Sequence, residues 1–148
     1  MLSQRARYAL KALLNIARNN QPAQQVGLIS EEENIPRKFL ETIMNELRRG
    51  GLVQSVRGCA GGYKLSRPAD LITVAEIVRA TDGPISMLPC VSRNFYQRCD
   101  DCEDEMACAL RKLFSEVRDA VTDILDHRTL ADALKLELQG RPVEGAAA

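Results

Sequence analysis

The order of the patterned segments in the first half of the chain constrains the fold more than any other feature of this sequence. Apolar residues recur at helical spacing over residues 3–19, a short helix fits residues 26–33, and residues 34–36 give a turn signal. A further periodic stretch continues to about Arg49 and ends at Gly50-Gly51, a pair typical of helix C-termini. The sequence therefore predicts three helices, with a turn between the second and the third.

A short glycine-rich hairpin is predicted next. Residues 52–56 alternate between apolar and polar side chains, and residues 63–65 form a second β-prone run. Between them lies Arg57-Gly58-Cys59-Ala60-Gly61-Gly62, a basic tip whose glycines permit a tight turn. Helix, short helix, turn, helix and two-stranded hairpin is the order of a winged helix-turn-helix. We therefore expect a mostly α-helical fold with a small two-stranded wing.

The helix after the turn is the candidate recognition helix for DNA. Its apolar positions, Phe39, Leu40 and Ile43 among them, are expected to point to the core. The polar side chains at its two ends, together with the wing arginine, are the candidate DNA contacts: Arg37, Lys38, Glu41, Thr42, Arg48, Arg49 and Arg57. The N-terminal end of such a helix reads bases, where a carboxylate can accept from cytosine N4, and an arginine on a wing suits the narrow minor groove.

The charge distribution agrees with this assignment. Residues 1–70 carry eleven Lys or Arg and six Asp or Glu, whereas residues 71–148 carry nine and fourteen. A basic half suits a polyanion such as double-stranded DNA. The alternative is chance segregation of charge on a solvated surface, so the ordered elements carry more weight than the charge.

Four cysteines in the second half form the candidate metal site. Cys90, Cys99, Cys102 and Cys108 follow the pattern C-x8-C-x2-C-x5-C, and three of them lie in the aperiodic stretch 84–103. A loop lets thiolates converge, and both zinc and iron–sulfur clusters accept four of them. Several acidic neighbours oppose a free thiolate, which favours a bound cation over bare thiols. Free thiols and a disulfide switch are the alternatives.

Other chemistry finds little support in the sequence. Cys59 stands apart on the hairpin tip, and the only histidine, His127, is remote from the cysteines. There is no P-loop, no Gly-x-Ser-x-Gly and no dinucleotide fingerprint, so we expect no enzyme; a small oxidoreductase is the least favoured class. The chain has no signal-peptide pattern and no apolar stretch near the roughly 18 residues of a membrane helix. We expect a soluble, cytoplasmic protein with no membrane partner.

The C-terminal part predicts a homodimer. From Glu105 to Asp126, apolar residues are spaced alternately by three and four, which gives a coiled-coil-like seam of Met106, Leu110, Leu113, Val117, Ala120/Val121 and Ile124. Thr129 can cap a last helix. We therefore divide the chain into a winged helix-turn-helix DNA-binding domain (1–83), a cysteine-rich sensor loop (84–104), dimerisation helices (105–139) and a disordered tail (140–148).

The sequence resembles the IscR/NsrR-like family of bacterial winged-helix iron–sulfur (or redox) transcription regulators. The matching stretches are Leu2–Leu14, Ile35–Leu52, Ser55–Leu65 and Ile72–Gly83. The wing, Ser-Val-Arg-Gly-x-x-Gly-Gly-Tyr, is the most specific of them. The resemblance implies a homodimer joined by its long helix, and a cluster held by three cysteines of each subunit whose state sets affinity for a pseudo-palindromic operator.

By position, Glu41 matches a base-reading residue of the family's recognition helix, and Arg57 matches the wing arginine. The cluster cysteines of the family are matched by Cys90, Cys102 and Cys108. The chain departs from the family in three places. Cys99 is an extra cysteine, Arg111 stands where the cluster assembly regulator has a histidine, and the aspartate ligand of some nitric-oxide sensors falls near Arg7.

Cys99 would then complete an all-cysteine site for a [2Fe-2S] or [4Fe-4S] cluster, with zinc as the alternative metal. The sequence thus predicts a transcription regulator, a repressor by analogy, gated by an iron–sulfur cluster. The competing hypotheses are a constitutive winged-helix repressor with structural zinc and a metal-free thiol redox switch.

Overall fold

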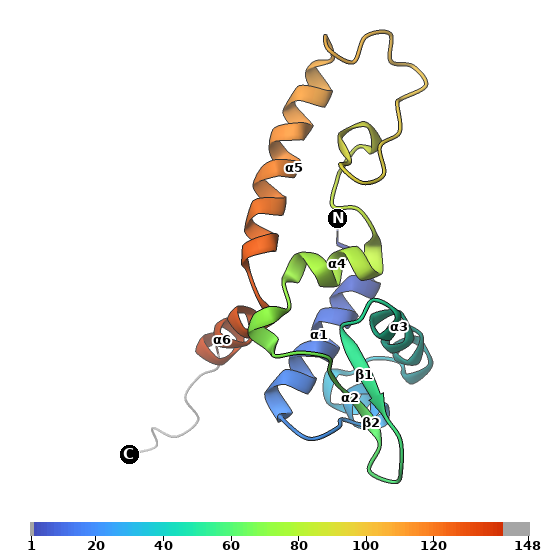
Figure 1. The fold of residues 1–148 in the computed structure, drawn as a ribbon, viewed down its shortest axis with the longest axis vertical. Coiled ribbons are helices and arrows are strands. Elements are labelled where there is room, and N and C mark those ends of the chain that lie inside the picture. The colour runs from blue at the N-terminus through green and yellow to red at the C-terminus, as the bar shows by residue number, and fades with distance from the viewer. Residues whose placement is uncertain (1, 141–148) are drawn as a thin grey trace.

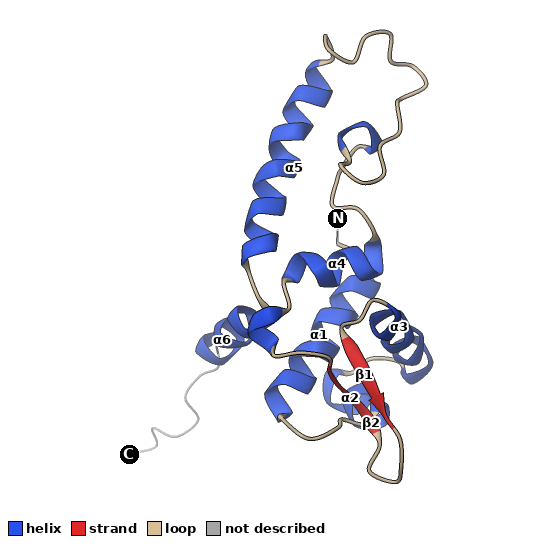
Figure 2. Ribbon diagram, in the orientation of Figure 1, coloured by secondary structure: helices blue, strands red, loops and turns tan. Residues whose placement is uncertain are grey.

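The first three helices and the hairpin form in the predicted order in the computed structural model, which describes residues 2–140 of the chain (Figure 1). The helices are α1 (Gln4–Asn19), α2 (Val26–Glu33), α3 (Arg37–Arg49), α4 (Val74–Asp82), α5 (Ala109–His127) and α6 (Leu130–Gly140). The strands are β1 (Val53–Val56) and β2 (Gly62–Leu65), and two short 3-10 turns cover Ala69–Leu71 and Pro89–Val91. Figure 2 shows a body built from α1–α4, α6 and the hairpin, from which α5 and the 84–108 segment extend.

Local sequence signals account for the helix ends. Gly51 has a φ of 73° and its N–H bonds Arg48 O at 3.1 Å, while the Leu52 N–H bonds Leu47 O at 2.9 Å. These two bonds form a Schellman motif that ends α3 and directs the chain into β1. A capping box begins α4, because the Thr73 side chain accepts from the Glu76 N–H and the Glu76 carboxylate accepts from the Thr73 N–H.

The core lies where α1, α3, α4 and β1 meet. Small residues Ala9 and Ala12 on α1 are fully buried, which lets neighbouring helices approach closely. The large side chains that fill the remaining space are also fully buried: Leu13, Ile29, Leu40, Ile43, Met44, Leu47, Ile72, Ile77 and Leu130. Leu130 at the start of α6 joins this cluster, so the chain returns to the body after α5.

The wing is an antiparallel pair in which Val53 faces Leu65 and Val56 faces Gly62. β2 also bonds to the segment before α2, since the Tyr63 N–H bonds Gln24 O at 2.9 Å and the Gln24 N–H bonds Tyr63 O at 2.8 Å. A Cβ on Gly62 would lie 2.3 Å from Gln24 O, closer than real Cβ atoms approach. Glycine at this position therefore permits the contact that attaches the wing to the body.

Three details differ from the sequence-based expectations. The long helix begins at Ala109 rather than Glu105, because Cys108 is its extended N-cap, and Met106 lies outside it with 74% of its surface exposed. Phe39 is not buried: it is 37% exposed and packs edge-on against Tyr8, with ring centroids 5.7 Å apart. Gly140 belongs to α6, and the rest of the predicted disordered tail lies outside the described residues.

Candidate nucleic-acid interface and cysteine loop

The helix α3 presents one buried and one exposed face. Leu40, Ile43, Met44 and Leu47 form the buried face. All of the candidate DNA contacts on this helix are exposed: Arg37, Lys38, Glu41, Thr42, Arg48 and Arg49. The structure thus brings them together on one solvent-facing surface, with the basic pair Arg48 and Arg49 at its C-terminal end.

The first and fifth residues of α3 form an ion pair. Arg37 Nε donates to Glu41 Oε1 at 3.1 Å, and the two side chains are 68% and 50% exposed. An exposed i, i+4 pair of this kind contributes only about 0.3–0.5 kcal/mol, so a base can displace either partner at small cost. The use of Nε leaves the terminal nitrogens of Arg37 available for a guanine edge.

The wing places its arginine at the tip. Arg57 directly follows β1 and its side chain is exposed, as are Gly58, Cys59 and Ala60. The tip lies at the far end of the hairpin from the body (Figure 2). Arg57 is therefore free of the core, as a minor-groove contact requires.

The four loop cysteines are all reduced but differ in burial. Cys90 is buried in the Pro89–Val91 turn, whereas Cys99, Cys102 and Cys108 are half-buried. The Cys102 N–H bonds Cys99 O at 3.2 Å, which closes the Cys-x-x-Cys turn. Cys108 Sγ accepts from the Arg111 N–H at 3.5 Å at the N-terminus of α5, where the helix dipole favours negative charge.

The thiols also act on one another. A hydrogen bond with Cys90, then partial burial and the charge of Cys90, raise the pKa of Cys99 above its usual value. Partial burial, then the charge of Cys108, raise the pKa of Cys102, although Arg98 opposes this. These interactions disfavour the free thiolates of Cys99 and Cys102.

Arginine side chains link the cysteine loop to α5. Arg111 Nε donates to Cys90 O at 3.4 Å, and Arg118 donates to Val91 O. Inside the loop itself, Arg98 Nη2 donates to Cys102 O at 2.7 Å. Sequence analysis missed these contacts. The spacing of Arg111 and Arg118, two helical turns apart on one side of α5, is the signal that could have indicated them.

The donor set fits a soft metal or cluster in its chemistry. Within residues 2–140, however, no three Cys, His, Asp or Glu side chains are close enough together to hold an ion. Metal binding would therefore complete the convergence of the sulfurs, as is usual when binding orders its own site. His127 lies at the opposite end of α5 and takes no part.

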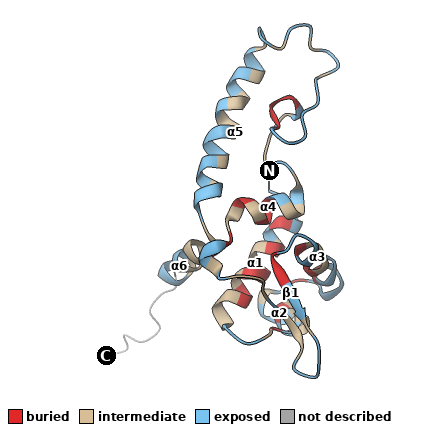
Figure 3. Cartoon of the chain, viewed as in Figure 1, coloured by how far each residue is buried: buried red, intermediate tan, exposed pale blue. Residues whose placement is uncertain are grey.

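Much of the apolar seam of α5 stays exposed to solvent within residues 2–140. None of its residues is buried (Figure 3), and Leu110, Leu113 and Ile124 expose 61%, 55% and 59% of their surface. Along the described part of the chain, no helix is both long and apolar enough to cross a membrane. A seam of this kind on a projecting helix is typical of a surface that another helix covers.

Three packed helices, an exposed third helix with basic residues at both ends and a two-stranded wing define a winged-helix DNA-binding protein. Residues 2–135 match the Rrf2 family, described as iron-dependent transcriptional regulators, and the chain belongs to that family. It is 44% identical over 138 residues to an rrf2-like HTH-type transcriptional regulator of Rhodobacter capsulatus, covering 90% of this chain and 92% of that protein.

Solved structures agree with this fold. CymR, the global cysteine regulator of B. subtilis, superposes with a TM-score of 0.76 at 32% identity, covering 92% of this chain and 97% of that one. IscR of T. potens superposes with a TM-score of 0.75 at 26% identity, covering 98% and 93%. The predicted winged-helix fold and family resemblance are confirmed, and the chain is a DNA-binding transcriptional regulator, not an enzyme.

Proposed function

We propose that this regulator is a homodimer whose affinity for its operator is set by an iron–sulfur cluster bound by Cys90, Cys99, Cys102 and Cys108. The observation that carries the proposal is the link from Arg111 and Arg118 on α5 to the backbone carbonyls of Cys90 and Val91, which holds the first cysteine against the helix that Cys108 caps. The family description as iron-dependent regulators and the likeness to IscR support the same assignment.

Three of the four proposed ligands occupy the positions of the family's cluster cysteines, and Cys99 is the addition. Cys90 at the first turn and Cys108 at the cap of α5 define the ends of the site, with Cys102 between them. Cys99, hydrogen-bonded to Cys90, would serve as the fourth ligand in place of the histidine position that Arg111 occupies. When bound, a [2Fe-2S] or [4Fe-4S] cluster supplies a charge and an occupancy that respond to oxidants or iron supply.

Two copies would join along the apolar seam of α5. This pairing covers Leu110, Leu113 and Ile124, which otherwise expose large apolar surfaces. A two-fold axis along α5 brings two winged helices to one DNA duplex, which matches a pseudo-palindromic operator. A protein working on chromosomal DNA in this way acts in the bacterial cytoplasm.

Within each half-site, the proposed contacts fall into two groups. Arg37, Lys38, Glu41 and Thr42 would face base edges in the major groove, because they stand at the N-terminal half of α3. Arg48, Arg49 and Arg57 would contact phosphates and the minor groove. Residues 1–83 thus act as the DNA-binding unit, 84–104 as the sensor and 105–139 as the dimer unit.

A thiol switch is the second candidate. The interaction with Cys90 that raises the pKa of Cys99 supports this candidate, because an oxidant that took up two electrons and two protons would join the two sulfurs in a disulfide. The likeness to CymR, a global cysteine regulator, favours this alternative.

One experiment distinguishes the iron–sulfur cluster, the thiol switch and structural zinc. The full-length protein is purified without oxygen, and its absorption spectrum, iron, sulfide and zinc are measured. We expect absorption at about 400 nm with iron and sulfide in equal amounts, because thiolate-bound clusters absorb there. A colourless protein with one zinc per chain, or with no metal and four titratable loop thiols, would contradict the cluster and support the corresponding alternative.

A further inference from the structure

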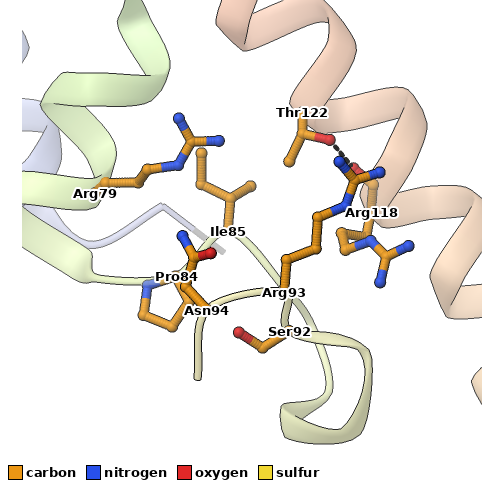
Figure 4. Close-up of a pocket in the computed structure, with 8 residues that line it drawn as sticks. All are labelled: Arg79, Pro84, Ile85, Ser92, Arg93, Asn94, Arg118 and Thr122. Carbon is orange, nitrogen blue, oxygen red and sulfur yellow. Dashed lines mark hydrogen bonds between the residues drawn. The ribbon is translucent and has the colours of Figure 1, made fainter. Parts of the chain in front are cut away.

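A cavity of about 340 Å³ lies between the end of α4, the segment 84–94 and the middle of α5. Figure 4 shows Arg79 reaching it from α4, Arg118 and Thr122 from α5, and Arg93 from the segment between them. Within the described residues 2–140, no carboxylate lines the cavity. It contains none of the candidate cysteines and none of the candidate DNA contacts.

Three guanidinium groups at this cavity share two carboxylates that stand outside it. Arg79 binds Asp126 through both terminal nitrogens at 2.7 and 3.2 Å, and Arg118 binds Asp119 at 2.7 Å. Arg93 reaches the same Asp119 through Nη2, also at 2.7 Å. Arg93 therefore keeps Nε and Nη1 for another acceptor. The three arginines and two aspartates together carry one positive charge in excess.

Two neutral donors, Ser92 and Asn94, line the same cavity. Ser92 is only 6% exposed, and its Oγ accepts from the Phe95 N–H at 3.1 Å. Among the hydrogen bonds of residues 2–140, the Ser92 hydroxyl proton finds no acceptor, and neither does the Asn94 carboxamide. The buried Ser92 hydroxyl, the exposed Asn94 amide and the two guanidinium nitrogens of Arg93 that Asp119 leaves available are donors that suit an oxyanion.

The remaining wall of the cavity is apolar. Pro84 and Ile85 line it opposite the polar donors. A ligand whose carboxylate bound Arg93 would thus place a short carbon chain against Ile85. The cavity volume is at the low end for ligand pockets, which favours a small ligand. An ammonium group would meet only arginines, since no acid lines the cavity.

We propose that this cavity binds a small monocarboxylate with a short apolar chain, held by Arg93, Ser92 and Asn94. Because its walls come from α4, the cysteine-bearing segment and α5, a bound carboxylate would connect the DNA-binding unit to the long helix. The ligand is an effector acting beside the cysteine site, and its binding does not depend on a cluster.

Calorimetric titration of the full-length apo-protein tests the proposal, with ionic strength held constant by chloride. The probes are butyrate, 2-aminobutyrate and sulfate. We expect one butyrate per chain with a dissociation constant of about 1 mM or lower, which is within the ceiling for a ligand of so few atoms. Binding of 2-aminobutyrate and of sulfate should each be weaker by about tenfold or more.

Variants locate the site. Arg93→Gln removes the guanidinium and Asn94→Asp places a carboxylate on an exposed lining position, so each should weaken butyrate by about tenfold or more. Arg5→Gln, which removes an exposed arginine paired with Glu46, and Asn20→Asp are the matched controls and should bind normally. Absence of saturable butyrate binding, equal binding of 2-aminobutyrate, or normal binding by both folded cavity variants would overturn the proposal.

Discussion

The Nε of Arg111 donates to the backbone carbonyl of Cys90 at 3.4 Å, which joins the buried first cysteine of the loop to the first turn of α5. The backbone N–H of the same arginine faces Cys108 Sγ. One residue thereby contacts both ends of the proposed ligand set.

Removing this link should loosen the site without unfolding the protein. We expect Arg111→Ala to weaken binding of Co²⁺ to the apo-protein by about tenfold, because charged hydrogen bonds are worth roughly 1.5–3 kcal/mol and this one is half-exposed. Thiolate–cobalt absorption measures the affinity without any cluster. Arg111→Lys should recover part of the loss, and the exposed neighbour Lys112→Ala should match the wild type. Wild-type Co²⁺ affinity in Arg111→Ala would refute this role.

Loss of the wing arginine and loss of the recognition-helix carboxylate should change DNA binding in different ways. Arg57→Ala should lower DNA affinity for all sequences and reduce the slope of log K against log salt by about 1 per subunit, since one charge is lost. Glu41→Ala should mainly relax base preference at one position per half-site. Competition binding over a series of salt concentrations distinguishes them. An unchanged slope and full affinity for Arg57→Ala would show that the wing does not enter the groove.

The attachment of the wing should depend on Gly62. A Cβ there meets Gln24 O at 2.3 Å, so Gly62→Ala forces the Gln24–Tyr63 bridge apart. We expect a loss of about 1–3 kcal/mol in the free energy of unfolding, measured by urea denaturation. Gly140→Ala, which meets no atom within 4 Å, should change little. Equal stability of the two variants would mean that the wing is attached by other contacts.

The sequence contained enough information for the body of the fold but less for the loop. Gly50-Gly51 is a local signal, because the bonds that it predicts lie within a few residues, and the end of α3 formed there as expected. The predicted first residue of α5, Glu105, was wrong, because the acidic residues before Cys108 resemble the first turn of a helix. The links from Arg111 and Arg118 end on backbone carbonyls, so the spacing of the two arginines along α5 was the only sequence signal for them.

The site residues divide in the same way. Glu41 and Arg57 could be selected by their place in the elements, but the pairing of Glu41 with Arg37 required coordinates. The cavity lined by Arg93 lies between segments that are far apart in the chain, so no sequence motif could predict it.

The seam of α5 should control assembly. Leu113→Asp buries a charge in the proposed dimer contact, and we expect it to shift the protein from dimer to monomer at micromolar concentrations in sedimentation equilibrium. Lys112→Asp puts the same charge on an adjacent exposed position and should remain dimeric. A dimeric Leu113→Asp protein would place the subunit contact elsewhere.

The central claim is that cluster occupancy sets DNA affinity through the loop cysteines. Cluster-loaded and apo-protein are compared without oxygen, on a duplex selected from a random pool by the full-length protein. The two wild-type forms should differ by roughly 5–150-fold, the range of a typical allosteric coupling. Cys90→Ala, Cys102→Ala and Cys108→Ala should bind DNA at the apo affinity only, Cys99→Ala should hold the cluster weakly, and Cys59→Ala should switch normally. A Cys108→Ala protein that retained full iron content and switched like the wild type would contradict the account.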